Sequence, residues 1–175
     1  MPTITSPGNY AWVNTAKVTL AGTADAGAVV ELFDDGVSVG TTTVSALGSW
    51  SRQVPAADGA HLYTAAATGL GGTSKQSAMR VVQVDTTAPS APVIISPSEG
   101  TTTGTTFTVS GTAEAGSTIE LYEDGSSRGT IAASNATWTR TLSGVSAGTH
   151  TYSARATDIA GNVSTMSIAR SLRVG

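Results

Sequence analysis

The sequence predicts an all-β protein made of two tandem Greek-key β-sandwich repeats, and three observations support this prediction. One set of motifs occurs twice along the 175 residues at a constant offset. Within each copy, apolar and polar residues alternate with a period of two, which is the pattern of half-buried strands. Turn-forming pairs such as Asp-Gly and Gly-Asn separate these short segments.

The duplication is visible in three sets of matching residues. GTADAG at 22–27 matches GTAEAG at 111–116, and ELFDDG at 31–36 matches ELYEDG at 120–125. The third set has the same offset and pairs His61, Tyr63, Ala65 and Ala67 with His150, Tyr152, Ala154 and Ala156. We therefore expect one domain over residues 1–85 and a second over residues 86–175. A linker at about residues 85–92 contains Pro89 and Pro92, which restrict its backbone.

Alternating segments predict about seven short strands in each repeat, a number typical of a Greek-key sandwich. In the second repeat we expect them at about residues 92–96, 105–113, 118–123, 127–132, 137–142, 149–157 and 163–173. Equivalent positions should form the two cores. These are Val18, Leu20, Val30, Leu32, Trp50, Tyr63, Ala65 and Ala67, with Phe107, Val109, Ile119, Leu121, Trp138, Tyr152, Ala154 and Ala156.

The two histidines and two of the arginines also occupy equivalent positions. His61 and His150 share a strand face with a tyrosine, so we interpret them as structural residues that close the sandwich edge in the manner of a tyrosine corner. Arg52 and Arg140 share a strand face with the core tryptophan. A β-bulge that turns these arginines outward is one explanation.

Composition excludes several classes of function. The net charge is −3 and no run of Lys or Arg exists, whereas nucleic-acid binding requires a basic patch. No apolar run approaches the roughly 18 residues of a membrane span, so we expect no membrane insertion. The absence of cysteine excludes a cysteine nucleophile, and no serine or acid pair is singled out by its position. We therefore expect that the chain is not an enzyme and needs no organic cofactor.

The motifs GTAxAG, ELYxDG, ATDxAGNVS and VDTTAP resemble those of tandem bacterial immunoglobulin-like (Ig-like) domains in large type I-secreted adhesins and biofilm-associated surface proteins. The resemblance implies an extracellular or cell-surface location, with neighbouring Ig-like repeats of a longer chain as partners. It also implies that some such arrays hold calcium where domains meet. The first repeat departs from the pattern, because Gly69 stands where the second has Asp158. A metal site at the start of the first repeat is therefore doubtful.

Acidic residues should gather where the two repeats are joined. If strands alternate in direction, the turns with Asp34, Asp35 and Asp58 lie at the pole where the chain leaves the first repeat. The turns with Glu114 and Asp158 then lie at the pole where the chain enters the second, and Asp85 lies in the linker. Ca²⁺ takes six to eight oxygen ligands, so we predict a structural interdomain calcium site. Its candidate ligands are Asp34, Asp35, Asp58, Asp85, Glu114 and Asp158. The alternative is that these acids are solvated turn formers.

These observations favour a structural spacer or stalk segment of a bacterial adhesin, with interdomain calcium as the element that would stiffen it. One alternative is a binding module in which Tyr10 and Trp12, which the second repeat lacks, contact a host or matrix glycan or protein. These two side chains could instead pack against their own sheet. Another alternative is an accessory domain pair of a secreted hydrolase.

Overall fold

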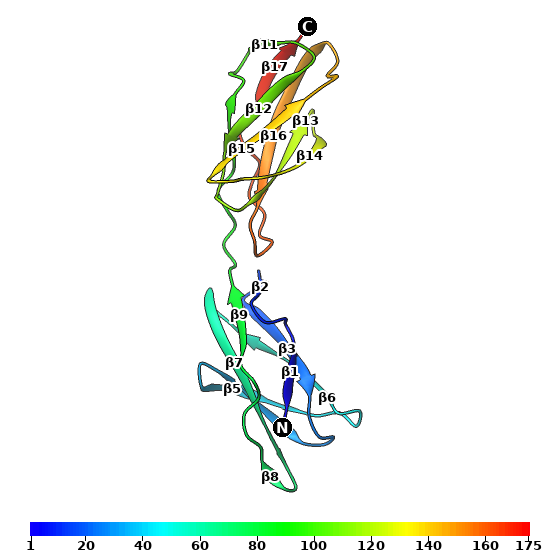
Figure 1. The fold of residues 1–175 in the computed structure, drawn as a ribbon, viewed down its shortest axis with the longest axis vertical. Helices are drawn as coiled ribbons and strands as arrows, with labels where there is room; N and C mark the ends of the chain where they lie inside the picture. The colour runs from blue at the N-terminus through cyan, green and yellow to red at the C-terminus, as the bar shows by residue number, and fades with distance from the viewer. The chain divides into compact units, whose positions relative to one another are not determined.

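The computed structural model describes all 175 residues, which form two compact units, Met1–Thr86 and Thr87–Gly175 (Figure 1). Both units consist of strands and turns, so the prediction of an all-β fold is confirmed. None of the chain forms a helix with the length and apolar character needed to cross a membrane.

The first unit is a sandwich of two sheets. One sheet has the order β1-β3-β6, and the other has the order β2-β9-β7-β4-β5 with the short β8 beside β7. The strands are β1 (Thr3–Ser6), β2 (Ala11–Val13), β3 (Lys17–Thr23), β4 (Val29–Asp34), β5 (Val37–Thr43), β6 (Ser49–Pro55), β7 (Gly59–Gly69), β8 (Gly72–Thr73) and β9 (Arg80–Val84).

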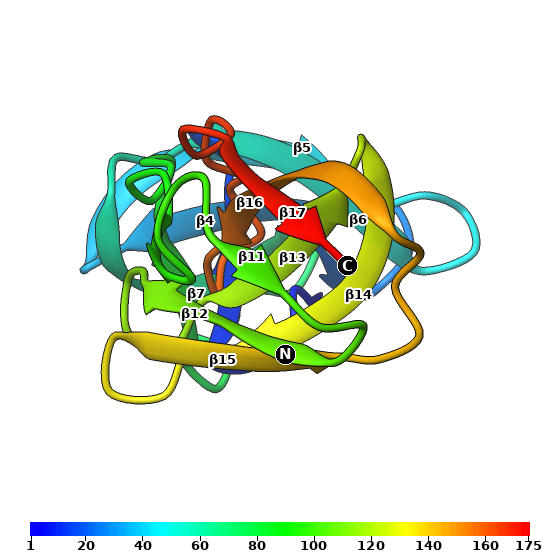
Figure 2. The ribbon, with the colours of Figure 1, turned by 90° about the horizontal axis from the view of Figure 1, so that it is seen from above.

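The second unit repeats this plan with the sheets β10-β12-β15 and β11-β17-β16-β13-β14. Figure 2 shows β12 and β15 in one layer and β16 and β17 in the other. The strands are β10 (Val93–Ser96), β11 (Thr102–Thr103), β12 (Phe107–Thr112), β13 (Thr118–Glu123), β14 (Ser126–Ala132), β15 (Thr137–Leu142), β16 (Gly148–Thr157) and β17 (Arg170–Val174). Seven of these match the expected strands, and β11 is an additional short one.

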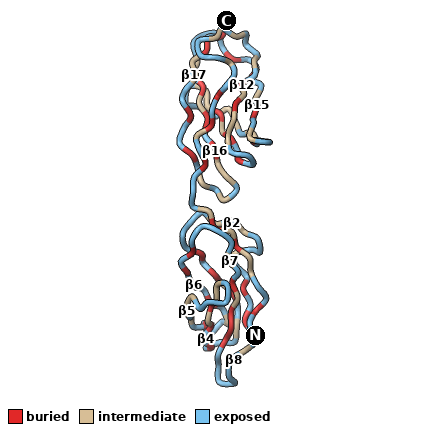
Figure 3. The backbone as a smooth tube through the Cα atoms, turned by 90° about the vertical axis from the view of Figure 1, so that its left-hand side faces the viewer, coloured by how far each residue is buried: buried red, intermediate tan, exposed pale blue.

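Buried residues alternate with exposed ones along the strands, as Figure 3 shows in red and blue. Each unit has its own core, in which the two sheets contribute aliphatic residues around a buried tryptophan and tyrosine. All expected core residues are buried except Phe107, which is partly buried and packs edge-on against Tyr152 with ring centroids 5.7 Å apart. The core prediction is therefore confirmed, with Phe107 at its margin.

The last predicted strand, residues 163–173, is wrong over its first half, because β17 begins at Arg170. Serine hydroxyls replace the carbonyl acceptors of a regular ladder there. Ser164 Oγ accepts a hydrogen bond from the backbone N–H of Ala156 at 2.9 Å, and Ser167 Oγ accepts one from Ala154 at 3.0 Å. Ser164 and Ser167 are three residues apart, whereas their partners Ala156 and Ala154 on β16 are two residues apart. The regular pairing of a strand with period two is therefore interrupted in this segment.

Arg52 and Arg140 join the two sheets of their units. The Arg52 guanidinium donates to the Thr41 carbonyl on β5, and Arg140 Nη2 donates to the Arg128 carbonyl on β14 at 2.8 Å. The bulge offered as one explanation for these arginines is absent from their own strands, since β6 pairs with β3 and β15 pairs with β12 without a register shift. The irregularity lies on β5, where Gly40 has φ 115° and an added Cβ would lie 2.3 Å from Arg52 Nη2.

A second arginine per unit joins the first strand to the last. Arg80 Nη2 on β9 donates to the Ile4 carbonyl on β1, and Arg170 Nη2 on β17 donates to the Ile94 carbonyl on β10. Because β1 and β9 belong to opposite sheets, this bond bridges one side of the sandwich. The sheets are therefore tied together by two equivalent arginines in each repeat.

Candidate functional site

The pole where the chain leaves the first repeat carries the acids that the topology prediction assigned to it. Asp34 lies opposite Tyr63 on β7, and Gly59 at the start of β7 lies opposite Val84 on β9. The turn after Asp34, the loop containing Asp58 and the chain at Asp85 therefore share one end of the sandwich.

Two of these carboxylates already have partners within their own repeat. Asp34 Oδ2 lies 2.6 Å from His61 Nδ1. Asp58 Oδ1 accepts hydrogen bonds from the backbone N–H and the hydroxyl of Thr86, at 2.9 and 2.8 Å. Asp35 occupies the turn with φ 47°. A calcium ion would have to share these oxygens, and the proposed ligand role of these acids stays a prediction.

His61 is held at both ring nitrogens. Besides the contact with Asp34, Nε2 lies 2.8 Å from the Ala57 carbonyl oxygen, and both acceptors are best satisfied by a protonated ring. Burial lowers the pKa of His61, but the Ala57 carbonyl and the carboxylates of Asp34 and Asp35 outweigh this effect, so the pKa is raised.

The tyrosine-corner expectation is wrong. The hydroxyls of Tyr63 and Tyr152 are buried and have no hydrogen-bond partner, whereas a tyrosine corner bonds its hydroxyl to the backbone. The His61 ring instead stacks on Tyr63, with centroids 5.7 Å apart and planes 7° apart. His61 therefore closes the sandwich edge through its contacts with Asp34 and Ala57. The sequence analysis predicted this structural role, but it did not predict these partners.

At the pole where the chain enters the second repeat, Asp158 anchors its own turn. Oδ1 accepts from the backbone N–H groups of Gly161 and Asn162 at 2.7 and 2.8 Å, and Oδ2 accepts from Asn162 Nδ2 at 2.8 Å. Burial raises the pKa of Asp158, but the bonds to Asn162 and Gly161 outweigh this and lower it. Glu114 lies exposed in a neighbouring turn.

The first repeat forms a different turn at the position equivalent to Asp158. Gly69 pairs with Gly72 there, so that β7 continues into the short hairpin with β8. The sequence departure that we noted thus changes the local backbone and removes the carboxylate. Calcium binding by Glu114 or Asp158 stays a prediction.

The sequence analysis missed a cluster at the opposite pole of the second repeat. Its members are Glu123, Asp124 and His150, whose ligand atoms all lie within 4.8 Å of one another. His150 Nδ1 lies 2.7 Å from Asp124 Oδ2 and 3.3 Å from Glu123 Oε1. In both repeats the acidic turn and the histidine are separated by the same number of residues. This equal spacing is the sequence feature that could have indicated the cluster.

Tyr10 and Trp12 lie at the edge of the first repeat. Tyr10 has φ 61° and its backbone N–H donates to the Val81 carbonyl, while Trp12 on β2 pairs with Gln83 on β9. The two residues are 68% and 43% exposed, so a ligand could reach both.

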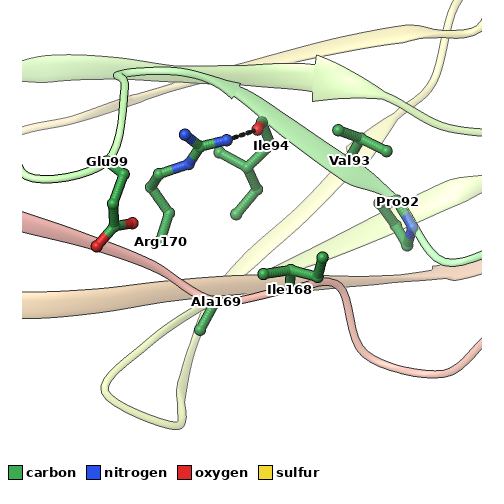
Figure 4. Close-up of a pocket in the computed structure, with 7 residues that line it drawn as sticks. All are labelled: Pro92, Val93, Ile94, Glu99, Ile168, Ala169 and Arg170. Atoms are coloured by element: carbon green, nitrogen blue, oxygen red, sulfur yellow. Dashed lines mark hydrogen bonds between the residues drawn. The ribbon is translucent and has the colours of Figure 1, made fainter.

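A shallow groove of about 390 Å³ runs between β10 and the segment before β17 in the second repeat (Figure 4). Val93 and Ile168 lie along it, and Arg170 crosses it to bond the Ile94 carbonyl. Its acid, Glu99, accepts from the backbone N–H of Ser171 at 2.9 Å. The two charged side chains of this groove are thus engaged in structural bonds.

Two Ig-like sandwiches in tandem define the class of this protein. The model of the bacterial Ig-like domain family matches residues 7–86 and again residues 95–174. The chain belongs to that family. No curated protein sequence matches it.

Among solved structures, the fibronectin(III)-like modules of Clostridium thermocellum CbhA match 99% of this chain and 93% of their own, at 19% identity and a TM-score of 0.65. The FN1–FN3 domains of chicken CNTN1 match 99% of this chain and 65% of theirs, at 12% identity and a TM-score of 0.54. A BSP domain of a biofilm-associated protein matches 99% of this chain and 29% of its own, at 20% identity and a TM-score of 0.38. At identities this low, the CbhA and CNTN1 matches show a shared fold and nothing about activity.

Proposed function

We propose that this pair of Ig-like repeats is a spacer segment of a bacterial adhesin, located outside the cell, whose role is to set the distance between other parts of its parent protein. One observation carries the proposal: the features that recur at equivalent positions of both repeats hold the sandwich together. They are the core, the two arginine ties and the histidine at the edge.

Features that could bind a ligand differ between the repeats. Tyr10 and Trp12 have no aromatic equivalents in the second repeat, and Asp158 has none in the first. A segment selected for length and stability needs the same framework in each repeat, and it does not need a surface site that both repeats share.

The test is an exchange in the bacterium that produces the parent protein. Replacing the pair by two unrelated Ig-like repeats of equal length should preserve surface display and adhesion, whereas deleting it should reduce adhesion. Loss of adhesion in the exchanged protein, with display unchanged, would mean that the pair contributes specific contacts.

We further propose that the pair is not an enzyme. Both nitrogens of His150 face structural partners, since Nδ1 contacts Asp124 and Nε2 lies 3.1 Å from the Ser146 carbonyl. The purified chain should therefore hydrolyse no ester, peptide or glycoside. Turnover that disappears in His150→Ala, in a variant that remains folded, would contradict this.

The second candidate function is glycan or protein binding through Tyr10 and Trp12, and their exposure is the observation that favours it. Aromatic faces of this kind supply large, rigid contact areas. A glycan-array screen of the wild-type chain against Trp12→Ala separates the candidates. Binding that the variant loses supports a binding module, and absence of binding in both supports the spacer.

A further inference from the structure

The cluster at the C-terminal pole of the second repeat has the chemistry of a metal site. Glu123 ends β13, Asp124 follows it in the turn with φ 48°, and His150 lies near the start of the neighbouring strand β16 (Figure 1). We propose that Glu123, Asp124 and His150 bind a divalent transition-metal ion of the Zn²⁺ type.

The spacing of the ligand atoms suits such an ion. Bonds of about 2.1 Å in a tetrahedral arrangement place neighbouring ligand atoms about 3.4 Å apart. Nδ1 of His150 lies 3.3 Å from Glu123 Oε1 and 2.7 Å from Asp124 Oδ2. A sub-ångström opening of the Asp124 contact would therefore admit the ion, with remaining positions open to water.

Each of the three ligands is oriented by an outer partner. Arg128 Nε lies 3.2 Å from the second oxygen of Glu123, and Thr151 donates its backbone N–H and hydroxyl to the second oxygen of Asp124 at 2.8 and 3.0 Å. The Ser146 carbonyl and hydroxyl lie 3.1 and 3.3 Å from His150 Nε2. When Nε2–H donates to that carbonyl, the lone pair of Nδ1 faces the carboxylates, as in metal-bound histidines.

A buried tyrosine adjoins the cluster. Tyr152 is fully buried and its hydroxyl has no hydrogen-bond partner, so it can donate to a water or anion bound to the metal. Tyr63 is buried in the same way in the first repeat, so the arrangement of carboxylates and imidazole, and not the tyrosine, distinguishes the second repeat.

The ligand set selects the class of ion. One imidazole nitrogen with two carboxylates suits zinc and its neighbours in the first transition row, whereas Ca²⁺ prefers oxygen ligands alone. The two carboxylates and Arg128 leave one negative charge when His150 is neutral, so a dication improves the charge balance.

The first repeat is a matched internal control. Asp34, Asp35 and His61 occupy the equivalent positions, but His61 forms an ion pair with Asp34 and none with Asp35. Val39 and Leu62 stand where the second repeat has Arg128 and Thr151, so the side chains that orient the carboxylates are missing.

The experiment titrates the metal-free chain with ZnCl₂ in a calorimeter at neutral pH and follows the histidine ring nitrogens by ¹⁵N NMR. We expect one equivalent of Zn²⁺ to bind, to shift Nδ1 of His150 and to leave Nε2 protonated. His150→Gln and Glu123→Gln should each weaken binding at least about 100-fold, because losing even an outer partner of a ligand costs 10–100-fold. His61→Gln should bind as the wild type does.

Several outcomes would overturn the proposal. Absence of heat and of ring-nitrogen shifts at millimolar Zn²⁺ would leave the cluster as a protonated histidine paired with two carboxylates. Equal weakening in His61→Gln and His150→Gln, with both variants folded by circular dichroism, would place the metal elsewhere. Wild-type affinity for Zn²⁺ in both single variants, Glu123→Gln and His150→Gln, would also place the metal elsewhere.

Discussion

Gly22 on β3 and Gly111 on β12 lie between the carbonyl of a neighbouring strand and the indole ring of the core tryptophan. A Cβ added at Gly22 would lie 1.8 Å from the Thr3 carbonyl oxygen and 2.6 Å from Trp50 Cζ2. At Gly111 the corresponding distances are 1.9 Å to the Val93 oxygen and 2.7 Å to Trp138 Cζ2. Alanine at either position therefore forces the first strand of the repeat away from the sheet.

The loss of unfolding free energy in Gly22→Ala follows from the packing and the hydrogen bonds that β1 would lose. Ile4 is 5% exposed, and returning such a side chain to water costs about 1.5–3 kcal/mol. Each lost hydrogen bond between β1 and β3 adds about 0.5–1.5 kcal/mol. We expect the first repeat to lose about 3–4 kcal/mol of unfolding free energy, and Gly111→Ala to do the same to the second.

Urea unfolding followed by tryptophan fluorescence measures these losses, since each repeat has a core tryptophan. Gly8→Ala and Gly104→Ala are the matched controls, because an added Cβ at either position meets no atom within 4 Å. A loss below about 1 kcal/mol, or an equal loss in the controls, would refute the packing argument.

The remaining predictions concern the core tryptophan of the second repeat, the histidine at the edge of the first repeat, and the acids predicted to bind calcium. Trp138→Ala should cost the second repeat about 3–5 kcal/mol in urea unfolding, and a loss below about 1 kcal/mol would mean that its strand face is misplaced. Folding raises the pKa of His61, so its pairing with Asp34 stabilises the first repeat below about pH 6.5 and is lost as pH rises through the folded-state pKa. Thermal unfolding should therefore show a larger deficit for His61→Ala at about pH 6 than at about pH 9, and a constant deficit would exclude the effect. Calorimetry should detect Ca²⁺ binding that weakens in Asp85→Ala and Asp158→Ala, whereas no heat at millimolar Ca²⁺ would leave these acids as turn residues.

Much of the fold could be predicted because it depends on patterns local in sequence. Alternation with a period of two placed Val109, Ile119 and Leu121 in the core, and all three are fully buried. The segment before Arg170 was misassigned because the hydroxyls of Ser164 and Ser167 take over the role of backbone acceptors there, and nothing in the alternation of neighbouring residues indicates this.

Contacts between distant strands were harder to predict. The role of Arg52 depends on a bulge at Gly40 in a strand of the opposite sheet, and a pattern along its own strand contains no sign of that bulge. The cluster around His150 was missed for a related reason. Equivalence with His61 indicated a structural residue, whereas Arg128 and Thr151, which distinguish the second repeat, become relevant only once the strands are paired.

The short strands β2 and β11 run parallel to the last strand of their repeats, β9 and β17. When the two ends of a repeat are pulled apart, parallel strands from opposite chain ends slide past each other. Their hydrogen bonds are then loaded in shear, all together, instead of opening one after another like a zipper. The β2–β9 pair spans three residues and the β11–β17 pair two. Backbone hydrogen bonds continue both pairs beyond these spans: Tyr10 donates to Val81 and Asp85 to Val13 in the first repeat, and Gly100 donates to Ser171 and Gly175 to Thr103 in the second. Both repeats should therefore resist tension through the same kind of shear contact between their first and last segments.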